Sequence, residues 1–206
     1  MTLRKQAVVA LPFIAGSAGV FVPVVAFIGI GLGLQAAPWF SWVADAVSDL
    51  GVSSVSAGFF NSGMICAGVL MFVFASGIYR GLSRKVGVCL GVASGALIGI
   101  GIAPETMFVP HWVCSACFFL SFAGCFLWCS LDSGLSPVLR WSGRGLTVLA
   151  IVSGGLAAAF PGIAIPEILV MVPGFFWCAG VGVWALILPA LAQKKTRKYK
   201  TPAMTG

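Results

Sequence analysis

The residues of this chain that could do chemistry are a handful of polar side chains in a very apolar sequence. Among 206 residues there are five carboxylates and one histidine. A carboxylate beside an imidazole can carry out general acid–base catalysis, and partial burial shifts pKa values toward that task. The candidate catalytic residues are therefore Asp49, Glu105 and His111. The candidate binding residues form a larger polar set: Asp45, Ser48, Asp49, Asn61, Glu105 and His111.

The spacing of this set predicts that its members share one end of the protein. Asp45 and Asp49 are four residues apart, so a helix there would put both on one face. A loop with two prolines contains Glu105 and leads to His111, and it could bring the two together. Two interpretations stay open. Either these groups are solvated at the membrane surface, with Asn61 bonded to a neighbouring helix, or they line a shared outward pocket that holds a cation or acts as an acid–base site.

Several metal and cofactor sites are argued against by the residues present. A single histidine cannot build a multi-histidine zinc site, and Cys114-x-x-Cys117 has no second pair of ligands. The glycines at 29, 31 and 33 follow no strand, as a nucleotide-binding loop would require. No metal and no cofactor are expected. All seven cysteines lie in apolar runs, where they are expected to act as small hydrophobic residues.

The elements that must position the polar set are apolar helices. The chain is 60% hydrophobic and 8% charged, with mean hydropathy +1.07, whereas a soluble domain carries about 25% charged residues. An apolar run of about 20 residues spans a membrane as a helix, and these runs lack the alternation of barrel strands. The sequence predicts an all-α polytopic membrane protein, with one domain at 1–192 and a basic tail at 193–206. Its six predicted spans form one bundle: 7–34, 54–79, 86–103, 111–130, 145–160 and 167–191.

Charge predicts the orientation of this bundle. All twelve Lys and Arg residues fall in the N-terminal segment, in two connections on the same side and in the tail. Four carboxylates and the histidine fall on the other side. Because positive charge marks the cytoplasmic side, both termini of this plasma-membrane protein are expected in the cytoplasm. The net charge of +7 is thus explained by membrane topology and does not indicate binding to nucleic acid. Membrane lipids are the expected partners. The first span is expected to be retained, although its cleavage as a signal peptide would leave the rest oriented in the same way.

Two predictions concern how the helices pack. The third span carries glycines at every fourth position, Gly87, Gly91, Gly95 and Gly99, which forms a flat face for another helix. Packing within the chain is the favoured interpretation, and a homo-oligomer or another protein partner is the alternative. In the fourth span, a stripe with cysteines is predicted to face the bundle: His111, Cys114, Cys117, Ser121, Cys125, Trp128 and Cys129. The aromatic residues Phe118, Phe119, Phe122 and Phe126 are then expected mostly toward lipid or neighbouring helices.

Three short motifs carry a family resemblance. These are Ser48-Asp49-Leu50-Gly51, Phe60-Asn61-x-Gly63 and Pro110-His111. In them the chain resembles the DUF998 family of small polytopic membrane proteins from bacteria and archaea, which usually have six spans and have no known function. The resemblance implies that Ser48, Asp49, Gly51, Asn61 and His111 occupy family motif positions, and it implies no activity.

Three functions are compatible with the sequence. The favoured one is a membrane protein that binds a lipid, a small amphiphile or a partner protein in an outward-facing polar groove. The second is a membrane-embedded enzyme acting on a lipid-like substrate at the outer leaflet. It needs His111 within hydrogen-bond reach of Asp49 or Glu105, directly or through one water molecule. The third is a small-molecule transporter, which needs a broken helix or a polar path that continues to the inner face.

Overall fold

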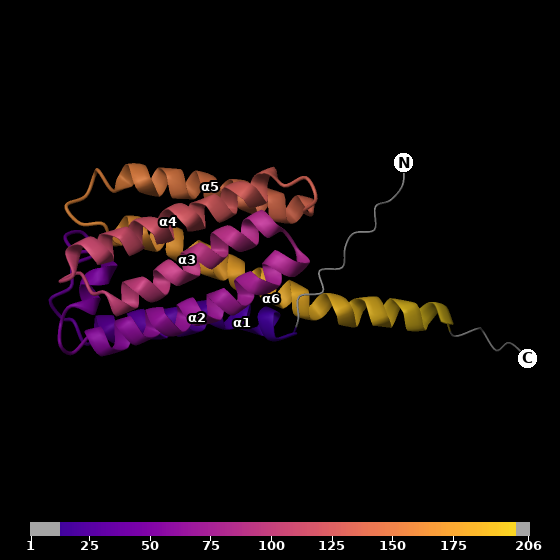
Figure 1. Ribbon diagram of the computed structural model, residues 1–206, viewed down its shortest axis with the longest axis horizontal. Helices are drawn as coiled ribbons and strands as arrows, with labels where there is room; N and C mark the ends of the chain where they lie inside the picture. Colours follow the sequence, from indigo (N-terminus) through magenta and orange to yellow (C-terminus); the bar gives the residue numbers. More distant parts are fainter. Residues whose placement is uncertain (1–12, 201–206) are drawn as a thin grey trace, which may run out of the picture.

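The computed structural model describes the backbone of residues 13–200 and the side chains of residues 13–187. Over this part of the chain every regular element is helical, which confirms the all-α prediction (Figure 1). The elements are α1 Phe13–Gln35, the 3-10 helix η1 Val47–Gly51, α2 Ala57–Gly81, α3 Arg84–Ile102, α4 Phe108–Leu131, α5 Pro137–Leu156 and α6 Ala164–Lys200.

Helices that follow one another in the chain pack side by side from α1 to α5, and α6 closes the bundle against α1 and α5 (Figure 1). Close crossings depend on glycine. A Cβ atom on Gly29 of α1 would lie 2.7 Å from the Cα atom of Gly63 of α2. A Cβ atom on Gly182 of α6 would lie 2.5 Å from the carbonyl oxygen of Gly16. Small residues at crossings are typical of membrane helices, since lipid supplies no apolar driving force between them.

Among the described residues, five of the six α-helices are long and apolar enough to cross a membrane: α1, α2, α3, α4 and the Ala164–Ile187 part of α6. The six-span prediction is therefore supported for five spans. Helix α5 differs because it begins at Pro137 rather than at 145, so that its first turns include Arg140 and Arg144. Residues 7–12 of the predicted first span and 201–206 of the predicted tail lie outside the described residues.

The orientation predicted for α4 is wrong in part. Cys117 and Trp128 of the predicted inner stripe are exposed. The buried face consists instead of His111, Phe118, Phe122, Cys125, Phe126, Cys129 and Ser130. The fit of a large ring to a glycine explains the difference, because a Cβ atom on Gly174 of α6 would lie 2.5 Å from the ring of Phe122. Packing of this kind, rather than polarity, orients a helix whose surroundings are apolar on every side.

The glycine face predicted on α3 is divided between two environments. Gly87 packs against the backbone at the end of α2, and Gly99 packs against a side chain of α4. Nothing lies within 4 Å of a Cβ atom built at Gly91 or Gly95. The favoured interpretation, packing within the chain, thus describes the two ends of this face. A homo-oligomer or another protein partner at the open middle stays a prediction.

Candidate functional site

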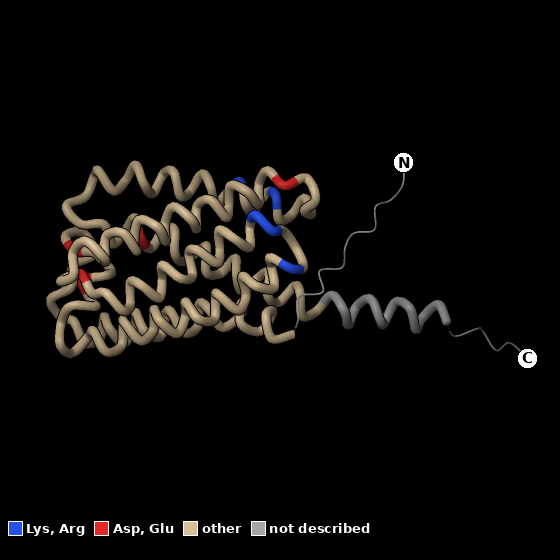
Figure 2. Tube along the Cα trace, in the orientation of Figure 1, with Lys and Arg blue, Asp and Glu red and all other residues tan. Residues whose placement is uncertain are grey.

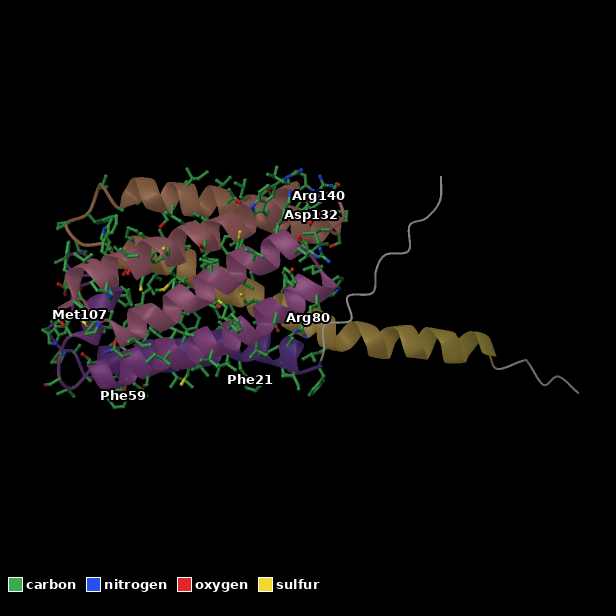
Figure 3. The ribbon with its side chains drawn as sticks, in the orientation of Figure 1. Phe21, Phe59, Arg80, Met107, Asp132 and Arg140 are labelled. Atoms are coloured by element: carbon green, nitrogen blue, oxygen red, sulfur yellow. The ribbon has the colours of Figure 1, made fainter. Side chains whose placement is uncertain are left out.

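The charged residues separate toward the two ends of the bundle (Figures 2 and 3). The basic end comprises the five cations Arg80, Arg84, Lys85, Arg140 and Arg144, together with Asp132. The acidic end comprises Asp45, Asp49, Glu105 and Glu167. The polar residues that the sequence singles out therefore have to be sought at the acidic end.

An open groove of about 530 Å³ lies at the acidic end. It is lined by Trp39, Asp45, Asp49, Val52, Ser53, Glu105 and Thr106. Most of the lining comes from the connection between α1 and α2, and the last two residues come from the connection between α3 and α4. The fold thus brings three of the predicted binding residues together from two distant parts of the sequence.

Backbone N–H groups hold the two aspartates of the groove. Oδ2 of Asp45 accepts a hydrogen bond from the N–H of Ser41 at 2.7 Å. Oδ2 of Asp49 accepts one from the N–H of Ala46 at 2.8 Å, at the start of η1. The helix predicted to align Asp45 with Asp49 is shorter than expected, because only Val47–Gly51 is helical and Asp45 precedes it. Folding of this turn nevertheless fixes both side chains at the groove before any ligand arrives.

Glu105 completes the acidic lining by pairing with Asp49. Its Oε2 atom is buried, and no N–H or O–H group among the described residues donates to it. Hydrogen bonding with the Asp49 carboxyl, burial, and repulsion by the Asp49 charge together raise the pKa of Glu105 to about 7. One proton shared by two carboxyl groups explains both observations. The charge of the groove therefore changes near neutral pH.

Glu167 lies on the other side of η1, in the first turn of α6. Its side chain is only 8% exposed, and Oε2 accepts a 2.7 Å hydrogen bond from the N–H of Val47. The N–H groups of Gly162 and Ala164 donate to the carbonyl oxygens of Val43 and Asp45. Together these bonds attach the groove-forming turn to the start of α6. The sequence placed Glu167 among the outer polar residues but did not assign it to the site.

A second, much smaller cavity lies behind η1. Its volume is about 20 Å³, enough for a single water molecule. The polar residues Ser48, Ser115 and Glu167 contribute to its lining, and the remaining lining residues are apolar. Ser48, a predicted binding residue, is buried and faces this cavity, so it is not among the residues that line the groove.

His111 is buried where α4 begins, with 6% of its side chain exposed. Its Nδ1 atom lies 2.8 Å from the carbonyl oxygen of Ala103, and its Nε2 atom lies 3.2 Å from Oγ of Ser115. A carbonyl oxygen only accepts, so Nδ1 carries the proton and Nε2 accepts from the serine hydroxyl in the neutral ring. Among the described residues, these hydrogen bonds join the imidazole to α3 and α4 rather than to Asp49 or Glu105.

Asn61 connects α2 to η1. Its Nδ2 group donates a 3.1 Å hydrogen bond to the carbonyl oxygen of Gly51, at the end of η1. Its Oδ1 atom is buried and accepts no hydrogen bond from the described residues. Gly51 has to be a glycine for this contact, because a Cβ atom there would lie 2.5 Å from Oδ1 of Asn61. Asn61 therefore supports the groove from below and does not line it.

Two further residues belong to the site, although the sequence did not assign them to it. Trp39 lines the groove, and its place in the connection that carries Asp45 and Asp49 was the available signal. Glu167 holds η1 from the core side, and its place in the first turn of an apolar helix was the available signal. In the described part of the chain no group of three or more His, Cys, Asp and Glu residues could hold a metal ion.

Comparison with known proteins assigns the chain to a family. The family model described as "Protein of unknown function (DUF998)" matches residues 17–184, a range that contains the whole groove and the cavity behind it. The chain belongs to the DUF998 family. Family membership confirms the resemblance carried by the three motifs. With its five apolar helices, this DUF998 chain is a multi-pass membrane protein. No curated protein and no solved structure matches it.

Proposed function

We propose that this DUF998 protein binds the positively charged head of a lipid or small amphiphile in its acidic groove. The observation that carries the proposal is the shared lining of one groove by Trp39, Asp45, Asp49 and Glu105. A volume of about 530 Å³ is typical of small-molecule sites, which range over about 300–1,000 Å³. A partner protein that inserts a lysine or arginine side chain would use the same groups.

The chemistry of the lining favours an ammonium group. The side chains of Asp45 and Asp49 are fixed by backbone N–H groups, so little conformational entropy is lost when a cation binds between them. Trp39 is 48% exposed, and the face of an indole ring attracts cations by about 0.5–2 kcal/mol. Carboxylates beside an exposed indole therefore favour an organic cation over a neutral or anionic ligand.

The surroundings of the groove favour a ligand with an apolar tail. Val52 lines the groove and is exposed, and Val55, Met107 and Phe108 are exposed close by in the sequence. Met107 lies at the same end of the bundle (Figure 3). Exposed indoles such as Trp39 are typical of the headgroup level of a membrane. An amphiphile could thus keep its head in the groove and its tail along apolar side chains.

We place the groove on the outer side of the plasma membrane, with both termini in the cytoplasm and with α5 as the sixth span. The cations of the basic end support this orientation through the positive-inside rule. Helix α5 runs alongside α4 and exposes Val138, Val148 and Ile151, which supports contact with lipid along its length (Figure 1).

A second candidate function is an enzyme that acts on a lipid-like substrate in the same groove, with Asp49 and Glu105 as the acid–base pair and without the predicted participation of His111. The observation that favours it is the Asp49–Glu105 pair, since the pKa of Glu105 is raised to about 7. At neutral pH Glu105 could give a proton while Asp49 accepts one. A transporter would need the polar lining to continue past the small cavity, where Met64, Leu97 and Phe118 lie.

The proposal is tested with dodecylamine, whose single chain carries an ammonium head, and with dodecanol as the uncharged control. The full chain is reconstituted in phosphatidylcholine nanodiscs, and binding is measured by isothermal titration calorimetry. We expect saturable binding of the amine alone, weakened at least tenfold by the Asp45→Asn/Asp49→Asn double variant. Asp132→Asn removes a carboxylate at the basic end and should change nothing. Equal binding of amine and alcohol, or equal loss in both variants, would contradict the proposal.

A further inference from the structure

The proposed function involves only the acidic end and assigns no role to the cations of the basic end. Its one carboxylate, Asp132, is engaged by neutral donors: Oδ2 accepts from Oγ of Ser83 at 2.7 Å, and Oδ1 accepts from the N–H of Gly134 at 3.0 Å. Arg140 lies at the same end of the bundle as Asp132 (Figure 3). Its Nε atom is nevertheless buried without a hydrogen-bond partner among the described residues. The described residues therefore supply no acceptor for this N–H group, which is able to donate to an anion.

Two of these cations are held on indole rings. Nζ of Lys85, on α3, lies 4.0 Å from the ring centre of Trp128 on α4. Cζ of Arg144 lies 4.4 Å from the ring centre of Trp141, which precedes it on α5. A cation–π contact positions a cation without cancelling its charge, and exposed tryptophans mark the headgroup level. Lys85 and Arg144 are therefore placed where lipid phosphates lie.

The rotation of α5 sets the direction in which its arginines point. Gly143 packs against the backbone of α4, and Ser142 accepts a hydrogen bond from Nε1 of Trp177 on α6. Successive residues of a helix are rotated by about 100° around its axis. Ser142 and Arg144 therefore project to opposite sides of Gly143. Because Ser142 contacts α6, Arg144 points away from α6. Arg140 lies one turn before Arg144 on the same flank. Arg140 therefore lies nearer to α4, whereas the guanidinium of Arg144 lies over Trp141 on the exposed side of α5. Lys85 of α3 lies over Trp128 of α4 at the same end of the bundle.

An apolar stripe continues from the arginines toward the middle of α5. Val148 and Val152 follow Arg144 at four-residue intervals on the same flank, and they are 60% and 50% exposed. The surface therefore has a cationic end at the headgroup level and an apolar continuation along the helix. This is the arrangement of a phospholipid with an anionic head.

We propose that Lys85, Arg140 and Arg144 form a binding site for the phosphate of an anionic phospholipid, whose acyl chain lies along Val148 and Val152. The phosphate would supply the acceptor that Nε of Arg140 lacks. The site lies at the opposite end of the bundle from the acidic groove, so it does not depend on the proposed function. A free anion fits the charge but not the apolar stripe, which is why a lipid is the chosen ligand.

Native mass spectrometry of the full chain tests the proposal with phosphatidylglycerol and with phosphatidylcholine of the same acyl chains. We expect preference for phosphatidylglycerol, and a loss of about fivefold for Arg144→Gln and for Arg140→Gln, since one cation near a membrane surface contributes about 1 kcal/mol. Arg144→Lys keeps the charge and should keep most of the affinity. Arg80→Gln removes an exposed cation from the same end and should have little effect.

Three results would overturn the proposal. The first is an equal affinity for the two lipids. The second is an equal loss for Arg80→Gln and Arg144→Gln, which would indicate unspecific attraction to the whole basic end. The third is complete displacement of phosphatidylglycerol by inorganic phosphate, which would indicate a site for soluble anions. If Arg144→Gln does not fold, Lys85→Gln provides the same comparison from α3.

Discussion

The acidic end and the basic end place charge at the membrane boundary in different ways. At the acidic end, backbone N–H groups of Ser41, Ala46 and Val47 hold carboxylates in fixed positions. At the basic end, Lys85 and Arg144 lie over indole rings at the ends of long side chains. The acidic end is therefore a groove whose carboxylates are held in place. The basic end is a surface whose long side chains can change position.

The largest effect is expected when the backbone at the acidic end is crowded by a larger side chain. A Cβ atom on Gly162 would overlap main-chain atoms of Ala44 and Asp45, which cannot move as a side chain can. We expect Gly162→Val to lower the free energy of unfolding by about 3 kcal/mol and to abolish amine binding. Unfolding in mixed detergent micelles measures the first effect. Gly91→Val, which has open space around it, is the control and should cost less than about 1 kcal/mol.

A second test compares one carboxylate from each end. Glu167→Ala leaves the N–H of Val47 buried without an acceptor, and we expect a loss of about 2 kcal/mol in unfolding free energy. Glu167→Gln keeps an acceptor oxygen and should recover most of that loss. Asp132→Ala removes partners of Ser83 and Gly134 in a more exposed setting, so it should cost less. If the two alanine variants lose the same stability, the acidic end is no more rigidly built than the basic end.

A third test uses pH and affects only the acidic end. Folding raises the pKa of Glu105 from 4.5 to about 7, so the folded protein holds this proton more tightly than the unfolded chain. The resulting stabilisation is complete below pH 4.5 and is lost as the pH rises through about 7. Glu105→Gln cannot titrate, and its amide can donate to Asp49 permanently. We expect the variant to unfold at the same temperature as the wild type near pH 4 and at a higher temperature near pH 8. Parallel melting curves at all pH values would show that Glu105 and Asp49 share no proton.

The smallest expected effect is at the basic end. Lys85→Gln removes the cation above the Trp128 ring and should lower the unfolding free energy by about 0.5 kcal/mol in detergent without anionic lipid. Arg84→Gln is the matched control, because Arg84 lies 6.0 Å from the ring centre of Tyr79 and its contact is weaker. An effect of Lys85→Gln above that of Glu167→Ala would mean that the basic end is structural rather than an adjustable surface.

The sequence predicts the helices, the end at which the site lies and three of its carboxylates, because these follow from hydropathy and from charge. It does not predict which polar residues face the groove. Ser48 and Asn61 turn toward the core because η1 is one short turn, and hydrogen bonds occupy both nitrogens of His111. The rotation of α4 escapes prediction for a different reason. In lipid both faces of a helix are apolar, so a periodic pattern of polar residues does not fix which face turns inward. The fit of Phe122 to Gly174 fixes the rotation of α4 instead.

The two ends of the bundle are proposed to bind different ligands independently of each other. Native mass spectrometry of the same samples tests this independence by measuring dodecylamine and phosphatidylglycerol binding, with Asp49→Asn and Arg144→Gln as the two variants. We predict a crossed pattern in which Asp49→Asn weakens only the amine and Arg144→Gln weakens only the phospholipid. Two variants that each weaken both ligands to the same extent would contradict the claim.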